Sequence, residues 1–172
     1  MNVKTLVAVG IQVVMMFSLA VSPMVLELTG TEVFLETQKM DPRALFRGDF
    51  VILGYLQAQD ILPVEMLEGH AGGPLKVYVT FTAERPAQFV AVTLERPDLE
   101  DGQVCIVGRA RWSGGAPSGA VRKISVDFPQ IAQYFVSEGE GRIIEQERGE
   151  NLLARVAVSS GCNAVLLGLE PR

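Results

Sequence analysis

Few residues in this chain are of the types that act as nucleophiles or metal ligands. Its only histidine, His70, stands in a run of glycine and proline that is typical of a solvent-exposed loop. Cys105 and Cys162 are far apart in the chain, and neither has a second ligand at the spacing of a zinc site. We therefore expect neither a metal ion nor another cofactor.

The sequence also lacks a recognisable motif for a catalytic serine. A Ser-His-Asp triad would need His70, and no G-x-S-x-G motif accompanies it. Residues 48–51 resemble the Gly-Asp-x-Val strand of membrane-anchored leader peptidases, which use a Ser-Lys dyad, but no serine occurs between Glu27 and Phe50. We therefore predict a protein that is not an enzyme and has no catalytic residue, with an envelope hydrolase as an alternative.

The cysteines leave two structural interpretations open. Both lie in regions where strands are expected, and a compartment outside the cytoplasm is oxidising. A disulfide requires Cα atoms within about 7 Å of each other, a separation that the sequence does not give. Two separate buried thiols at Cys105 and Cys162 are favoured, and a disulfide between them is the alternative.

Composition and charge argue against a nucleic-acid-binding protein and against a disordered chain. The chain has 172 residues, with 15 Lys and Arg against 20 Asp and Glu, a formal net charge of −5 and 48% hydrophobic residues. An acidic surface disfavours a nucleic-acid partner, and the apolar content is sufficient for a folded core. The length corresponds to one domain.

The beginning of the chain is apolar enough to cross a membrane. Residues 5–26, between Lys4 and Glu27, carry no charged side chain. As a helix they would extend for about 33 Å, against about 30 Å for the hydrocarbon core of a bilayer. Since the positive charge precedes the helix and an acidic region follows it, we expect a cytoplasmic N-terminus and a domain on the other side.

The alternative for this segment is a cleaved signal peptide, because Ser18 and Ala20 are small residues at plausible cleavage positions. The uncharged run continues past Ala20 and exceeds the usual apolar region of a signal peptide. A retained transmembrane anchor over residues 1–28 is therefore favoured, followed by an extracytoplasmic domain over residues 29–172.

The remainder of the chain has the pattern of a mainly β domain. Runs rich in β-branched and aromatic residues recur between glycine and proline turn signals. Alternation of polar and apolar residues over 75–82 and 155–159 predicts half-buried strands. We expect an antiparallel sandwich or a barrel-like domain, with strands at residues 32–37, 50–57, 75–82, 88–94, 103–112, 123–127, 152–159 and 164–169.

One or two short helices are expected between the strands. Residues 41–46 begin with Asp41 as a helix N-cap and Pro42 at the first helical position. Residues 129–135 and 141–148 also have compositions compatible with helices.

Two motifs resemble those of the GDYXXLXY family, a group of bacterial membrane-anchored proteins. Residues 48–55 read GDFVILGY, with Phe50 in place of the first tyrosine, and residues 133–142 read QYFVSEGEGR, which resembles the second common segment of the family. The resemblance implies an anchor followed by one domain in the bacterial inner membrane. It also implies association with a multi-span membrane protein, and it implies no reaction.

The motifs place charged residues at two turns. We hypothesise that these residues form a charge-paired cluster joining the two segments, and that Tyr55 contributes its hydroxyl on the same strand face as Asp49. The structural alternative is that they only define the fold. The candidate interaction or fold-defining residues are Arg47, Gly48, Asp49, Tyr55, Glu138 and Arg142.

Together these features predict a membrane-anchored accessory or interaction subunit that works beside a polytopic membrane protein. Residues 5–26 contact the lipid bilayer, and Ser18 and Ser22 share a helix face on which another helix is able to pack. A domain that senses a small ligand is a further alternative, with a pocket beside Tyr55 and Arg47 as its expected sign.

Overall fold

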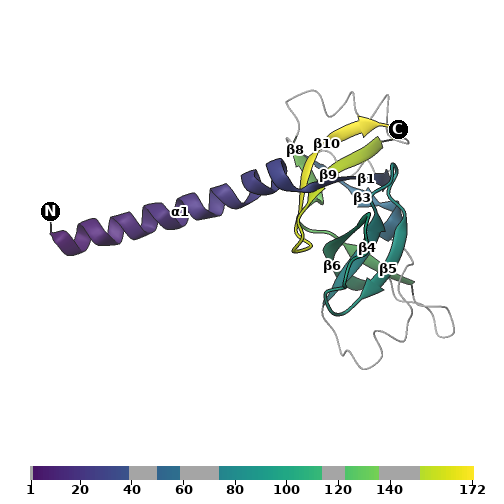
Figure 1. The fold of residues 1–172 in the computed structure, drawn as a ribbon, viewed down its shortest axis with the longest axis horizontal. Helices are drawn as coiled ribbons and strands as arrows, with labels where there is room; N and C mark the ends of the chain where they lie inside the picture. Colours follow the sequence, from purple (N-terminus) through teal and green to yellow (C-terminus); the bar gives the residue numbers. More distant parts are fainter. Residues whose placement is uncertain (1, 39–49, 59–73, 114–122, 136–151) are drawn as a thin grey trace.

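A computed structural model of the chain contains a long N-terminal helix that projects from a β-rich body (Figure 1). The structure describes residues 2–38, 50–58, 74–113, 123–135 and 152–172. Helix α1 spans Val3–Thr29 and continues through Pro23, and its 27 residues correspond to a length of about 40 Å. Gly30 ends the helix by donating its N–H to the carbonyl of Leu26, and the first strand begins at the next residue.

The body consists of antiparallel strands in three sheets. One four-stranded sheet has the order β10-β9-β1-β3, a second has the order β5-β4-β6-β7, and β2 pairs with β8 alone. The strands are β1 Thr31–Gln38, β2 Phe50–Ile52, β3 Gly54–Tyr55, β4 Leu75–Thr82, β5 Phe89–Thr93, β6 Gln103–Ser113, β7 Lys123–Asp127, β8 Gln133–Phe135, β9 Leu152–Val158 and β10 Ala164–Pro171, and a short 3-10 helix, η2, spans Leu56–Ala58.

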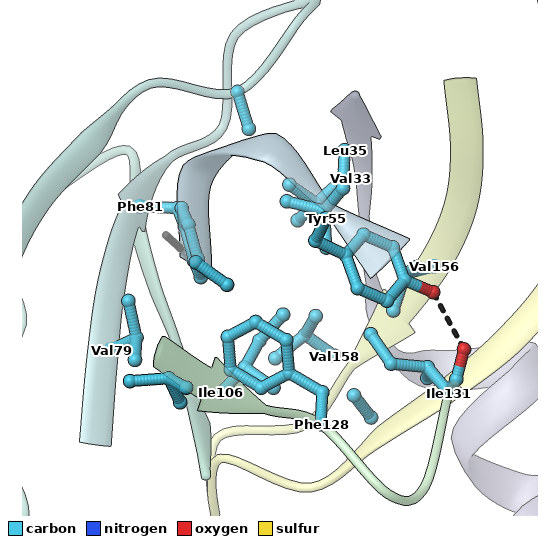
Figure 2. Close-up of a cluster of buried hydrophobic side chains, with 14 of the residues drawn as sticks. Val33, Leu35, Tyr55, Val79, Phe81, Ile106, Phe128, Ile131, Val156 and Val158 are labelled. Carbon is cyan, nitrogen blue, oxygen red and sulfur yellow. Dashed lines mark hydrogen bonds between the residues drawn. The ribbon is translucent and has the colours of Figure 1, made fainter. Parts of the chain in front are cut away.

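The hydrophobic core lies between the two four-stranded sheets (Figure 2). The alternation along β4 places Val77, Val79 and Phe81 in this core, as the sequence predicts for a half-buried strand. The opposite sheet contributes Val33 and Val156 to the same cluster. The described strands therefore form a sandwich-like body of open sheets, which confirms the mainly β prediction.

Strand β9 is more buried than its alternating sequence predicts. Val156 and Val158 face the core, but Ala157, on the other face, is also fully inaccessible to solvent. The end of α1 explains this burial, because a Cβ added to Gly30 would lie 3.0 Å from the Ala157 Cβ. The expectation of a strand with one solvated face was therefore wrong at this position.

Two predicted elements differ from the structure. The strand expected over residues 50–57 is divided into β2, β3 and the 3-10 helix, and β2 and β3 pair with different strands. Residues 129–135, expected to be helical, form a turn and then β8. The other two predicted helices, over 41–46 and 141–148, lie outside the described residues.

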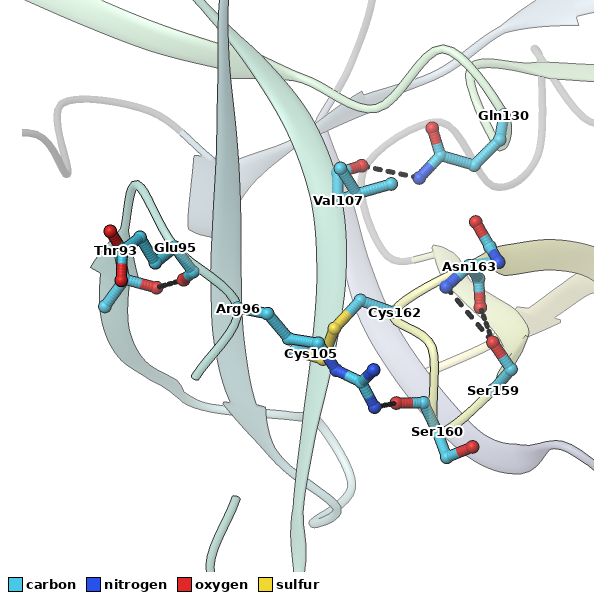
Figure 3. The surroundings of a disulfide bond; sticks show 10 residues. All are labelled: Thr93, Glu95, Arg96, Cys105, Val107, Gln130, Ser159, Ser160, Cys162 and Asn163. Atoms are coloured by element: carbon cyan, nitrogen blue, oxygen red, sulfur yellow. Dashed lines mark hydrogen bonds between the residues drawn. A yellow bond between two sulfur atoms is a disulfide. The ribbon is translucent and has the colours of Figure 1, made fainter. Parts of the chain in front are cut away.

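Cys105 and Cys162 form a disulfide, so the favoured interpretation of two separate thiols was wrong (Figure 3). Cys105 lies on β6, while Cys162 lies in the turn between β9 and β10, with its Cα 4.8 Å from that of Cys105. The bond therefore links the two four-stranded sheets covalently. The N–H of Val107 also donates to the Cys162 carbonyl, at 2.9 Å.

Candidate functional site

The two sequence motifs lie side by side in the body. Strand β2, from the first motif, pairs with β8, from the second, and Phe50 stands opposite Phe135. The N–H of Leu53 extends the contact by donating to the Ala132 carbonyl at 2.8 Å. The described part of the first motif is therefore attached to the start of the second motif and to the residue before it.

Tyr55 completes this attachment from the core side (Figure 2). Its hydroxyl donates a 2.6 Å hydrogen bond to the carbonyl of Ile131, and both residues are buried. The ring packs edge-on against Phe128 at 5.8 Å, and Phe128 packs in the same way against Phe81. Burial raises the pKa of the Tyr55 hydroxyl above its usual value. Tyr55 therefore holds two segments together.

The division of the predicted strand changes the expected position of Tyr55. We expected Asp49 and Tyr55 to share one face of one continuous strand, but Tyr55 belongs to β3, which pairs with β1 in another sheet. Its side chain points into the core, away from solvent. The pocket was expected beside Tyr55 and Arg47, and Arg47 lies outside the described residues, so this expectation stays a prediction.

The remaining candidates of the predicted cluster lie outside the described residues, and its charge pairing stays a hypothesis. Asp49 is covalently bonded to Phe50, the first residue of β2, which stands opposite the last residue of β8. The structure thus brings together the strands that carry the motif residues. The candidates not described are Arg47, Gly48, Asp49, Glu138 and Arg142.

The sequence did not reveal which residues contact Tyr55 of the first motif. Ile131 belongs to residues 129–135, which were expected to be helical from their composition, and Phe128 lies just before them, outside any expected element. The aromatic pair Tyr134 and Phe135, which favours a strand, was the available signal for β8.

A surface depression of about 470 Å³ lies beside this segment. One wall is the turn before β8, where the side-chain amide of Gln130 donates to the Val107 carbonyl at 2.7 Å. Strand β6 contributes Val107, Gly108 and Arg109 to the lining, and β4 contributes Lys76. Its lining residues include Pro74, Lys76, Gly108, Arg109, Pro129 and Gln130.

A second depression, of about 390 Å³, lies near the disulfide. It is lined by Arg96, Asp98, Leu99 and Ser160 among others. Figure 3 shows the Arg96 side chain extending to the Ser160 carbonyl, to which it donates a hydrogen bond. Since Asp98 adds a carboxylate to the same lining, this depression is less cationic than the first.

In the described ranges, no three His, Cys, Asp or Glu side chains gather in a way that would hold a metal ion. The cysteine sulfurs bond to each other and therefore offer no thiolate ligand or nucleophile.

Helix α1 is apolar and long enough to cross a membrane. Its most apolar 18-residue window has a mean hydropathy of 2.1, and none of that window is buried against the body. Where α1 ends, the chain packs closely on the body, since a Cβ added to Gly30 would lie 3.0 Å from the Ala157 Cβ.

Comparison with known proteins identifies the family of this chain. No curated protein and no solved structure matches it significantly. The family model described as "GDYXXLXY protein" matches residues 12–169, from within α1 to β10. Leu53 and Tyr55 stand at the leucine and last tyrosine of the motif in the family's name, while Phe50 replaces the first tyrosine. The chain therefore belongs to the GDYXXLXY protein family.

Proposed function

We propose that this protein is a membrane-anchored accessory subunit, in which α1 crosses the bacterial inner membrane and the β body acts outside the cytoplasm beside a larger membrane protein. The observation that carries the proposal is the apolar surface of α1, which the body leaves uncovered.

Large apolar side chains are exposed along almost the whole helix. The exposed fraction is 74% at Met16, 68% at Phe17 and 76% at Leu28. Each Å² of such surface left in water costs about 25 cal/mol, so lipid or another apolar helix is needed to cover it. The exposed residues include Val3, Leu6, Val7, Ile11, Val13, Val14, Met15, Val21, Met24, Val25 and Leu28.

Two hydroxyl groups of α1 are compatible with an apolar surrounding. Ser18 donates its Oγ proton to the Met15 carbonyl at 2.8 Å, and Thr29 donates to the Val25 carbonyl at the same distance. Such bonds within the helix offset the desolvation of a hydroxyl in lipid. The Ser18 oxygen retains its ability to accept a hydrogen bond, which leaves this face suited to a neighbouring helix.

The distribution of charge supports a cytoplasmic N-terminus. Lys4 lies at the beginning of α1, whereas Glu27 lies at its end and introduces an acidic body. Positively charged residues near a span favour the cytoplasmic side. The disulfide between Cys105 and Cys162 also suits an oxidising compartment.

The junction between helix and body supports a subunit whose position is fixed relative to the membrane surface. A single residue, Gly30, separates Thr29 of α1 from Thr31 of β1. A Cβ at position 30 would lie 2.7 Å from the Leu26 carbonyl oxygen, so the packing here is tight. A body held this closely to its anchor favours contact with a neighbour in the same membrane.

Several groups able to do chemistry have structural roles instead. The buried Tyr55 hydroxyl donates a hydrogen bond to the Ile131 carbonyl. Cys105 and Cys162 are buried and form a disulfide. These roles favour a binding function over catalysis by these residues.

Co-purification tests the proposal. The chain, tagged after Arg172 and produced at its native level, is extracted in mild detergent after cross-linking in intact cells. We expect a multi-span membrane protein in a fixed ratio with the chain. A matched control replaces residues 3–28 with an unrelated spanning helix and retains the body.

Recovery of the same partner with the chain and its loss with the control would assign the interaction to α1. Recovery with both would assign it to the body. A chain that purifies alone and labels stoichiometrically with a serine-nucleophile probe would contradict the accessory role and favour the hydrolase alternative.

A further inference from the structure

Two cations stand directly opposite each other on neighbouring strands of the second sheet. Lys76 on β4 and Arg109 on β6 are register partners in an antiparallel pair. Residues in this relationship have Cβ atoms about 5 Å apart, and like charges there repel each other. Both side chains line the 470 Å³ depression beside the turn before β8.

The described residues provide neither cation with an ion pair. The Lys76 Nζ lies 5.0 Å from the centre of the Tyr78 ring. This contact does not neutralise the positive charge of Lys76 as a carboxylate would. Asp127 is the register partner of Arg109 on β7, and it takes part in an interaction. Even with Asp127 counted, the three aligned residues carry one net positive charge in an otherwise acidic protein.

We propose that this depression binds a small phosphate-bearing anion. The guanidinium and the ammonium offer several N–H donors to the oxygens of one phosphate group, and the two groups together are a common phosphate-binding combination. Bound phosphate would remove the repulsion between Lys76 and Arg109. The inference goes beyond the accessory role and does not depend on it.

The family motif positions one wall of this site. Gln130 is held on the Val107 carbonyl at 2.7 Å, and its neighbour Ile131 receives the Tyr55 hydroxyl at 2.6 Å. Tyr55 is thus a positioning residue that fixes the turn carrying Pro129 and Gln130. Its hydroxyl lies in the core, bonded to the Ile131 carbonyl, and would not touch a bound anion.

Calorimetric titration of the full chain in detergent micelles with inorganic phosphate tests the site. Low salt is used because ions screen such contacts, and chloride at equal ionic strength serves as the reference. We expect saturable phosphate binding that weakens about tenfold in Lys76→Met and in Arg109→Gln, with a smaller loss in Arg109→Lys.

The charge-matched control is Arg172→Gln. Arg172 pairs with Glu36 at 3.0 Å on the other sheet, so its loss changes the net charge equally without touching the depression. Circular dichroism of each variant verifies the fold. Absence of saturable binding in the wild-type chain, or an equal loss in Arg172→Gln, would overturn the proposal.

The same titration distinguishes a soluble anion from a lipid headgroup. Micelles containing phosphatidic acid are compared with micelles containing only phosphatidylcholine. Competition by phosphatidic acid that disappears in Arg109→Gln would assign the site to a headgroup, whereas unchanged phosphate binding would assign it to a soluble anion.

Discussion

The hydroxyl of Tyr55 donates a 2.6 Å hydrogen bond to the main-chain carbonyl of Ile131, across 76 positions of the sequence. Tyr55 ends the first family motif, and Ile131 precedes β8, which begins the second. With the β2–β8 pairing, this bond joins the two motifs into one structural unit. It gives the last motif tyrosine a physical role that does not require a substrate.

Replacing Tyr55 with phenylalanine should destabilise the body by about 1–2 kcal/mol, because the buried Ile131 carbonyl would lose its partner. Chemical unfolding of the full chain in detergent, followed by circular dichroism, measures this loss. Tyr78→Phe is the matched control, since the Tyr78 hydroxyl has no hydrogen-bond partner within the described segments, and its effect should stay below about 0.5 kcal/mol. Equal effects of the two variants would contradict the structural role of Tyr55.

Stability should fall more steeply at alkaline pH in the wild-type chain than in Tyr55→Phe. Burial raises the pKa of Tyr55, so the folded chain keeps a proton that the unfolded chain releases above about pH 10. The stabilising contribution is complete below that pH and is lost as pH rises further, by about 1.4 kcal/mol per pH unit. Unfolding free energies of both proteins across this range test the difference, and parallel curves would exclude a buried Tyr55 hydroxyl.

The disulfide should be present in the purified protein and should stabilise the body. Intact-mass measurement after alkylation of the denatured, unreduced chain should find no modified cysteine. In the double variant Cys105→Ala and Cys162→Ala, the free energy of unfolding should be about 2–4 kcal/mol lower, because the bond restricts the unfolded chain. Two alkylated cysteines in the unreduced protein would disprove the link between the sheets.

Substitution of Gly30 by alanine should loosen the junction between α1 and the body. The added Cβ would lie 2.7 Å from the Leu26 carbonyl oxygen and 3.0 Å from the Ala157 Cβ, so the backbone must shift, at a cost of about 1–3 kcal/mol. Proteolysis near residue 30 should become faster. Gly10→Ala is the control, because the Cβ added there meets no atom within 4 Å. Equal cleavage of both variants would refute tight packing at Gly30.

Much of the fold follows from local sequence patterns. The uncharged run over residues 5–26 predicts the exposed apolar helix, and the alternation of Val77, Val79 and Phe81 predicts the core face of β4. Such patterns succeed where one element has one buried face. They fail at Ala157, because its burial depends on the end of α1, which is remote in sequence.

The candidate site was less predictable than the fold. The motif residues Leu53 and Tyr55 were identified, but the pairing of β2 with β8 depends on contacts that cross more than half of the body's sequence. The disulfide partners were likewise known only as two cysteines, since a Cα separation of 4.8 Å results from sheet packing. The proposed anion site did not emerge from the sequence because Lys76 and Arg109 become neighbours only through strand register.

The orientation of the chain in the membrane is the most direct test of the proposed anchor. Alkaline phosphatase, which is active only outside the cytoplasm, is fused after Arg172, and the mass of the chain shows whether α1 is retained. We predict high phosphatase activity in the membrane fraction, with residues 1–28 still attached. An inactive fusion, a soluble fusion or a chain cleaved near Ala20 would contradict the account.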